Sequence, residues 1–123
     1  MDNKLILEGL KMDKSLAVFE GFKIRRHYDE IKNVWYFSVV DIIRALIQQN
    51  DFQMARKYWN KLKERLIDEG SQSVTNCHQL KMRAADGKYY LTDVADAETL
   101  LRLIQSVPSP KAEPIKLWLA RVG

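Results

Sequence analysis

Apolar and polar positions alternate along the first part of the chain with the period of two that β-strands require. This alternation covers residues 16–19 and 23–28, which flank the turn sequence EGF. The strongly β-prone run VWYF at 34–37 follows the polar segment DEIKN. The pattern predicts a small antiparallel meander of three strands.

The apolar positions change to helical spacing after Ser38. Val39, Ile42, Ile43 and Leu46 would share one face of a helix that ends near residue 48. Asp41 follows Ser38 by three positions, the spacing at which a hydroxyl and a carboxylate cap a helix start. Ser38 is therefore predicted to be the N-cap.

A second helix is predicted after the polar break QQND, at about residues 52–69. Its apolar face consists of Ala55, Trp59, Leu62 and Leu66, and Gly70 is a natural end. The centre of the chain thus has the order helix, short turn, helix.

A second hairpin is predicted over residues 78–93. Asp86-Gly87 would supply a tight two-residue turn. Thr92 or Asp93 is expected to cap a further helix, which the sequence SVPSP at 106–110 ends. A last helix is expected over AEPIKLWLARVG at 112–123, because a proline at 114 is tolerated in a first turn.

The fold predicted from this order is α+β, with two antiparallel β-hairpin-plus-helix units and about four helices around one core, including a helix-turn-helix-like segment. The strand-to-helix sequence FSVVDIIRAL at 37–46 returns in looser form at 90–104. Neither unit can bury its apolar face alone, so the two are expected to pack together. The domain is predicted to span residues 16–123, preceded by a mobile arm or short helix at 1–15.

Composition adds that the chain of 123 residues fits one domain with an ordinary hydrophobic content of 46%. No apolar run approaches the roughly 18 residues that cross a bilayer, and the N-terminal sequence lacks the features of a signal peptide. Cys77 is the only cysteine, which excludes an internal disulfide. These features predict a cytoplasmic protein without membrane contact.

Charge is sorted along the chain, although the net value is only +4. Between residues 53 and 67, five Lys and Arg side chains face a single acid, Glu64, which gives a local net charge of 5 − 1 = +4. A run of this kind is commonly a solvated helix face, but it also suits a polyanion.

Duplex DNA is the polyanion that the residue types favour. The second of two helices joined by a turn can enter a major groove, and Arg, Gln and Asn near its N-terminus can pair with bases. We expect this helix to contact DNA. Lys63 is expected to be turned away from Arg56 and either to contact a phosphate or to make no contact with DNA. The candidate DNA-binding residues of the helix are Gln53, Arg56, Lys57, Asn60, Lys61 and Lys63.

Basic hairpin residues form a second candidate surface, since strands can enter a groove or lie on phosphates. Solvated outer strand faces explain each of them equally well. Trp35, Trp59 and Trp118 lie in apolar stripes and are predicted to be core rather than stacking platforms. The candidate DNA-binding residues of the hairpins are Arg25, Lys81, Arg83 and Lys88, with Lys23 beside them.

The sequence gives little support to catalysis. Cys77 and His78 are neighbours, so on a strand their side chains point to opposite faces. They and His27 lack the spacing of zinc ligands. Acids at 93, 96 and 98 are explained by a helix start. No cofactor or metal is expected, and an enzyme such as a metal-dependent nuclease ranks third among the functions considered.

Several landmarks together resemble the Bro-N domain, the N-terminal part of prophage antirepressors and of BRO proteins of large DNA viruses. They are the hairpin aromatics Trp35 and Phe37, Asp41 in the helix start, the Arg56-Lys57 pair, the LLRLIQS run at 100–106, and Ala112, Ile115 and Trp118. Ile115 stands where the family usually has phenylalanine. The resemblance covers residues 16–123.

The resemblance implies a DNA-binding regulatory domain that is usually followed by a separate C-terminal domain. The expected partner is double-stranded DNA, and DNA-binding domains of this size often pair, so we hypothesise a homodimer. The alternative is a protein-interaction module that inactivates a repressor without itself contacting DNA.

Overall fold

Strands and helices together form an α+β domain over residues 15–123, the part of the chain that the computed structural model describes. The predicted arm at 1–15 lies outside these residues except for Ser15. The elements are β1 (Leu16–Phe19), β2 (Phe22–Asp29), β3 (Val34–Ser38), α2 (Val39–Ile47), α3 (Phe52–Asp68), α4 (Gln72–Thr75), β4 (His78–Arg83), β5 (Tyr89–Ala95), α5 (Ala97–Gln105) and α6 (Ala112–Val122). The predicted fold class is confirmed, and only the short α4 was not expected.

The strands of both hairpins join in one antiparallel sheet with the order β1-β2-β3-β5-β4. The two hairpins meet through only two residue pairs, Phe37 with Ala95 and Ser38 with Val94. Each of these pairs lies where a strand gives way to a helix. The repeated strand-to-helix sequence thus forms the seam between the two units, and beyond it β4 and β5 continue as a separate two-stranded ribbon.

The turn between β1 and β2 differs from the turn between β4 and β5. Glu20 and Gly21 both have positive φ angles, 45° and 84°, as a tight two-residue turn with right-handed strand twist requires. In the second hairpin only Gly87 has a positive φ, and its amide donates to the carbonyl of Ala84 over 3.0 Å. Because Ala84 also pairs with Lys88, the loop has three residues, and the predicted two-residue turn is wrong.

The start of α2 confirms the predicted cap. Ser38 Oγ accepts a hydrogen bond from the amide of Asp41 over 3.3 Å. Ser38 and Asp41 are both buried, at 0% and 1% exposure. This helix start therefore lies inside the domain rather than on its surface.

The predicted cap of α5 at Thr92 or Asp93 is wrong. Both residues belong to β5, where they pair with Leu80 and Gln79 of β4. Asp96 caps the helix instead, and its carboxylate accepts from the amide of Thr99 over 2.9 Å. A hydroxyl followed by an acid predicts a helix start only where no neighbouring strand is available to pair with it.

Core residues from both units pack in one cluster of the described chain. Phe37, Ile43 and Leu46 of the first unit contact the same interior as Leu100 and Leu119 of the second. Trp59 and Trp118 belong to this cluster at 2% and 7% exposure, whereas Trp35 is half-buried at its margin. The predicted shared core is confirmed.

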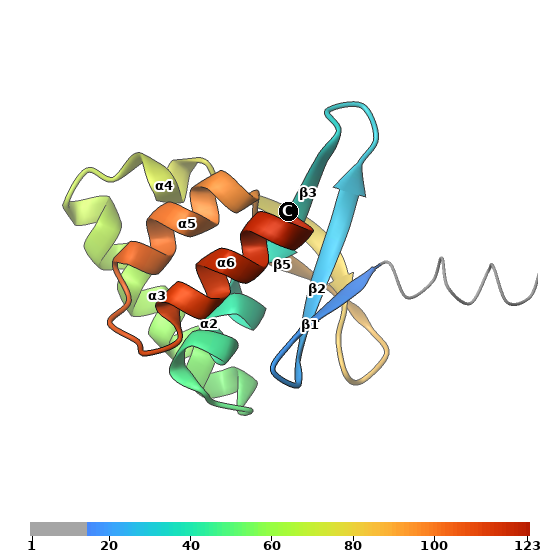
Figure 1. Ribbon diagram of the computed structural model, residues 1–123, viewed down its shortest axis with the longest axis horizontal. Coiled ribbons are helices and arrows are strands. Elements are labelled where there is room, and N and C mark those ends of the chain that lie inside the picture. The colour runs from blue at the N-terminus through green and yellow to red at the C-terminus, as the bar shows by residue number, and fades with distance from the viewer. Residues whose placement is uncertain (1–14) are drawn as a thin grey trace, which may run out of the picture.

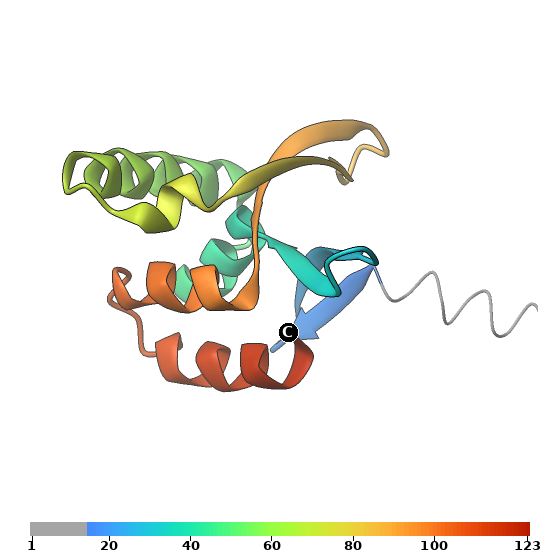
Figure 2. The same ribbon diagram turned by 90° about the horizontal axis from the view of Figure 1, so that it is seen from above.

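The arrangement of layers decides which elements are free to meet a ligand. Figure 1 shows the helices gathered at one end of the molecule and the strands at the other. Figure 2 shows that α3 and the β4–β5 ribbon lie on one side, with α6 and β1 on the opposite side. Helix α2 lies between these layers and is buried along most of its length.

Candidate nucleic-acid interface

Helix α3 presents its polar side to solvent. Ala55, Trp59, Leu62 and Leu66 are buried at the predicted positions, which turns the opposite side of the helix outward. Asp51 caps the helix through the amide of Gln53 over 2.9 Å. The exposed side chains of the helix include Gln53, Arg56, Lys57, Asn60, Lys61 and Glu64, together with Met54, Arg65, Ile67 and Asp68.

The cations on this side of α3 are uncompensated. Within residues 15–123, Arg56, Lys57 and Lys61 take part in no ion pair. Six other cations are joined to acids, namely Arg25, Lys63, Arg65, Arg102, Lys111 and Lys116. The solvent-facing side of α3 therefore carries three cations without an acidic partner among the described residues, which adds positive potential there.

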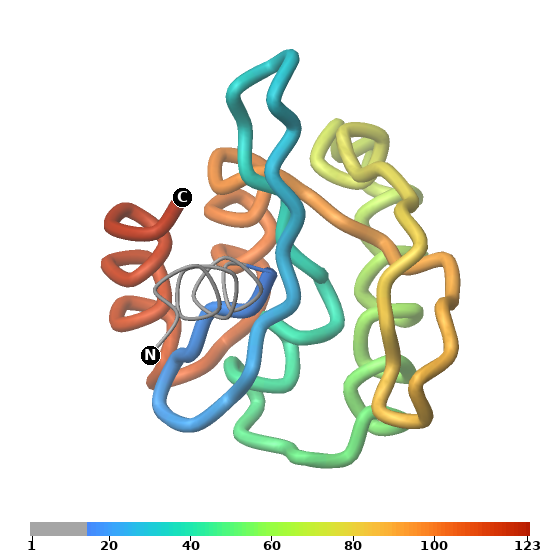
Figure 3. The backbone as a smooth tube through the Cα atoms, turned by 90° about the vertical axis from the view of Figure 1, so that its right-hand side faces the viewer, coloured from blue at the N-terminus to red at the C-terminus, as the bar shows by residue number. Residues whose placement is uncertain are grey.

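The β4–β5 ribbon adds further free cations beside the helix. Lys81, Arg83 and Lys88 are exposed and, in the part of the chain that the structure describes, form no ion pair. Figure 3 shows the ribbon alongside α3. We call the surface formed by these two elements the basic face; its cations are Arg56, Lys57, Lys61, Lys81, Arg83 and Lys88.

Asp93 of β5 is the joint that holds the ribbon to α3. Its carboxylate accepts hydrogen bonds from Trp59 Nε1 over 2.7 Å, from Lys63 Nζ over 3.1 Å and from Gln79 Nε2 over 3.1 Å. Burial alone would raise the pKa of the Asp93 carboxyl, but these three donors together hold the pKa below its usual value. The carboxylate is thus ionised and fully engaged.

Lys63 occupies a different place from the one expected. It lies seven positions after Arg56, which is two helical turns, so both side chains are on the same side of α3. The expectation that Lys63 turns away from Arg56 is wrong. Because Asp93 neutralises Lys63 and the Trp59 ring lies 5.6 Å from its ammonium group, it contributes little free charge to the basic face.

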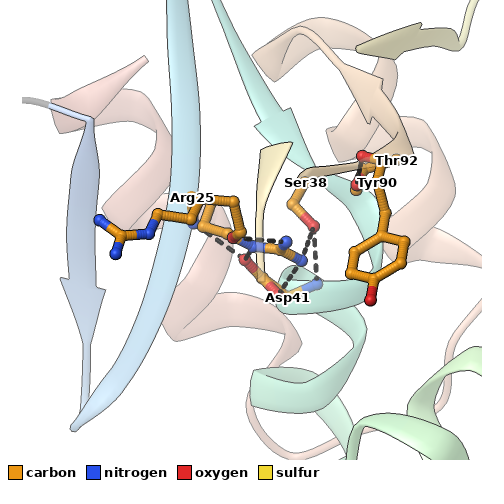
Figure 4. A network of polar contacts seen from close by, with 6 residues as sticks. Arg25, Ser38, Asp41, Tyr90 and Thr92 are labelled. Atoms are coloured by element: carbon orange, nitrogen blue, oxygen red, sulfur yellow. Dashed lines mark hydrogen bonds and ion pairs between the residues drawn. The ribbon is translucent and has the colours of Figure 1, made fainter. Parts of the chain in front are cut away.

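Arg25 of β2 is also engaged within the fold, as Figure 4 shows. Its backbone amide and Nε both donate to Asp41 Oδ2, over 2.9 and 2.8 Å, and Nη2 donates to Asp41 Oδ1 over 3.1 Å. Nη1 reaches the carbonyl of Arg83 over 3.2 Å. Arg25 thereby ties β2 to the start of α2 and to the ribbon. Because its guanidinium is engaged in these contacts, we do not count Arg25 among the cations of the basic face.

Sequence reasoning missed the residues that set the start of α3. The guanidinium of Arg44 lies 3.8 Å from the centre of the Phe52 ring, and its Nε is buried without a hydrogen-bond partner. Burial lowers the pKa of Arg44, while Asp41 opposes that shift. The aromatic ring thus replaces water beside a cation, and it fixes the position of the first turn of α3.

The residues considered for catalysis have ordinary surroundings. Burial, together with Asp93, raises the pKa of the Cys77 thiol to about 11, so it is protonated at neutral pH. His78 packs edge-on against Tyr36 at 5.4 Å. Among residues 15–123, no three His, Cys, Asp or Glu side chains are placed to hold a metal ion. None of the helices in that range could cross a membrane.

An α+β domain with free positive charge on a helix and a β-ribbon is typical of the class of DNA-binding domains. The chain belongs to the BRO family, whose N-terminal domain model matches residues 24–122. That family consists of regulatory, generally DNA-binding domains of the prophage-antirepressor type and is not an enzyme family. Comparison with curated proteins and with solved structures finds no match.

Proposed function

We propose that this domain binds duplex DNA through its basic face and serves as the DNA-binding part of an antirepressor-like regulator. Helix α3 is the main contact in this proposal. Gln53, Arg56, Lys57 and Asn60 lie in its first three turns and are exposed, which suits side chains that reach base edges. Lys61 and the ribbon cations Lys81, Arg83 and Lys88 would hold phosphates.

The observation that carries the proposal is the distribution of free charge. Among the described residues, six exposed cations without an ion pair lie on α3 and the ribbon, whereas the exposed unpaired cations elsewhere, Lys23, Lys32 and Arg121, lie apart on β2, in the β2–β3 turn and on α6; the cations at the joints are paired. A solvated helix face would gain nothing from remaining uncompensated, because pairs at i, i+4 are easily formed. A surface for phosphates requires free cations.

The test is a fluorescence-anisotropy titration with a short mixed-sequence duplex at several salt concentrations. The logarithm of the binding constant should fall linearly with the logarithm of the salt concentration, by about 0.9 units for each phosphate contacted. Absence of binding even at low salt would exclude the proposal.

A matched pair of charge variants locates the contact. Lys57→Gln with Lys61→Gln should weaken binding and lower the salt slope by about two units if each lysine meets one phosphate. Lys32→Gln with Arg121→Gln removes the same charge from exposed positions in the β2–β3 turn and on α6. Equal losses in both variants would mean that net charge, and not this face, drives binding.

Two protein partners are considered, a second copy of this chain and a repressor. A homodimer would present two copies of α3 to neighbouring half-sites, as two-fold symmetric DNA-binding domains do. Sedimentation with and without duplex tests this, and a monomer in both cases would exclude it. The alternative function is inactivation of a repressor without DNA contact. Only an absence of DNA binding in the titration would favour it.

A further inference from the structure

The ribbon has two different faces beyond the point where it leaves the sheet. Side chains alternate along β5, so Tyr90 and Thr92 share one face while Tyr89 and Leu91 share the other. Figure 4 shows Tyr90 and Thr92 on the side toward Ser38 and Asp41, in agreement with the packing of β5 against α2. Tyr89 and Leu91 share their face with Asp93, and beyond the contact of Asp93 with α3 both side chains are exposed to solvent.

The outward face combines large apolar side chains with free cations. Tyr89 and Leu91 are 64% and 62% exposed. In the register of the hairpin, Tyr89 lies directly across from Arg83, and Leu91 lies across from Lys81. Each apolar side chain thus stands beside one cation on the same face of the ribbon.

The contacts that hold the ribbon in place come from its opposite face and from its turn. Met82 is 7% exposed on that face, and the carbonyl of Arg83 accepts from Arg25 Nη1. At the turn, Asp86 accepts from Tyr90 Oη over 2.6 Å and from the amide of Lys88 over 2.8 Å. The ribbon is held in place by these contacts, without any contribution from Tyr89 or Leu91.

We infer that the ribbon is a second DNA-contacting element, in which Lys81 and Arg83 hold phosphates while Tyr89 and Leu91 press between base pairs and partly unstack them. This inference rests on the proposed function. Apolar side chains of groove-binding elements act as wedges of this kind, and the backbone contacts around them offset the cost of unstacking.

Charge complementarity favours DNA over a protein partner as the occupant of this face. A protein surface that buries Tyr89 and Leu91 would also have to neutralise Lys81 and Arg83, which lie directly beside them. Duplex DNA meets both demands, since the apolar faces of its stacked bases lie between two rows of phosphates. Asp93, on the same face of β5, contacts Trp59 and Lys63 of α3, so this surface adjoins the helix that carries the other free cations.

The experiment compares binding of a matched duplex with binding of the same duplex carrying a central two-base mismatch. Unstacking is easier at a mismatch, so the native protein should bind the mismatched duplex at least about fivefold more tightly. Tyr89→Ser with Leu91→Ser should abolish this preference and leave the salt slope unchanged, because Lys81 and Arg83 remain. Tyr89→Phe alone should retain the preference.

The control is Ile31→Ser with Leu117→Ser, which removes apolar side chains that are 95% and 66% exposed from the β2–β3 turn and from α6. This variant should keep the mismatch preference. Thermal unfolding monitored by circular dichroism establishes that both double variants are folded.

The outcomes separate the inference from the proposed function. If the native protein binds duplexes but does not prefer the mismatch, or if the ribbon variant keeps the preference, the wedge is excluded while DNA binding stands. If the ribbon variant alone changes the sedimentation coefficient without DNA, the face is a contact between copies of the chain and the inference falls. Absence of any duplex binding excludes both ideas.

Discussion

Single residues in this domain combine local and long-range tasks that a sequence pattern cannot separate. Asp41 was predicted as part of a helix start, and it does follow the cap Ser38. Its carboxylate, however, receives Arg25 from a strand sixteen positions earlier. Spacing along the chain revealed the cap, but the partner of Asp41 depends on how β2 lies over α2, which no local pattern encodes.

The first prediction distinguishes these two roles. Ser38→Ala should lower the free energy of unfolding by about 1 kcal/mol, the usual cost of a lost cap. Asp41→Ala should cost about 3 kcal/mol, because it leaves the partly buried guanidinium of Arg25 without its counter-ion. Urea denaturation monitored by circular dichroism measures both. Equal losses of stability in the two variants would show that the ion pair with Arg25 adds nothing. The DNA affinity of both folded variants should equal that of the native protein.

Arg56 carries the second prediction at this scale. Arg56→Lys keeps the charge but removes the two-pronged donor that pairs with guanine. Binding to a duplex enriched from a random library should weaken by about 1–3 kcal/mol, while binding to unselected duplexes should hardly change. Anisotropy titrations on both kinds of duplex give the comparison.

Lys61 is the matched control for Arg56, since Lys63 is neutralised by Asp93. Lys61→Ala should weaken binding to all duplexes alike and lower the salt slope by about one unit. If Arg56→Lys instead leaves the sequence preference intact, base reading belongs to another part of the basic face.

At the scale of elements, periodicity predicted the bounds of a helix or strand well where the residues of that segment alone determine its structure. Residues 52–68 form a helix because Ala55, Trp59, Leu62 and Leu66 fall on one side, and the observed α3 has the predicted bounds within a residue. The end of β5 was misplaced because Thr92 and Asp93 suit a cap equally well. Pairing with β4, a contact between distant segments, decided the outcome.

The third prediction concerns the joint between α3 and the ribbon. The pKa of Asp93 is lowered in the folded protein from its ordinary value of 3.8, so the native state favours the ionised carboxylate. This contribution to stability is fully present above the unfolded value and is lost as pH falls through the lower folded value. Asp93→Asn should therefore be less stable than the native protein at neutral pH, with the gap closing below about pH 4.

Unfolding free energies of both proteins across this pH range give the measurement. Asp68→Asn is a suitable control, because Asp68 is an exposed acid at the end of α3 with no ion pair among the described residues. The difference in unfolding free energy between the native protein and Asp93→Asn should shrink at low pH. If it stays constant down to the lowest pH, the three donors do not act by stabilising the ionised carboxylate.

At the scale of the whole molecule, the two hairpin-helix units depend on one interior. Their sheet contact is short, with only Phe37–Ala95 and Ser38–Val94 in register. What unites them is the shared cluster around α2 and α5, with Asp93 and Arg25 tying the ribbon to each side. The basic face spans elements from both units, so its geometry requires that they fold together.

The last prediction tests this dependence with the same substitution in each unit. Leu46→Ala in α2 and Leu100→Ala in α5 both remove a leucine that is 1% exposed, and each should cost about 2–5 kcal/mol. Each variant should shift the whole urea transition, with circular dichroism and tryptophan fluorescence coinciding, since Trp59 and Trp118 contact the shared cluster. Separate transitions for the two probes, or a leucine whose loss affects only one of them, would show that the units unfold independently. The basic face could then be lost by unfolding of one unit while the other stays folded.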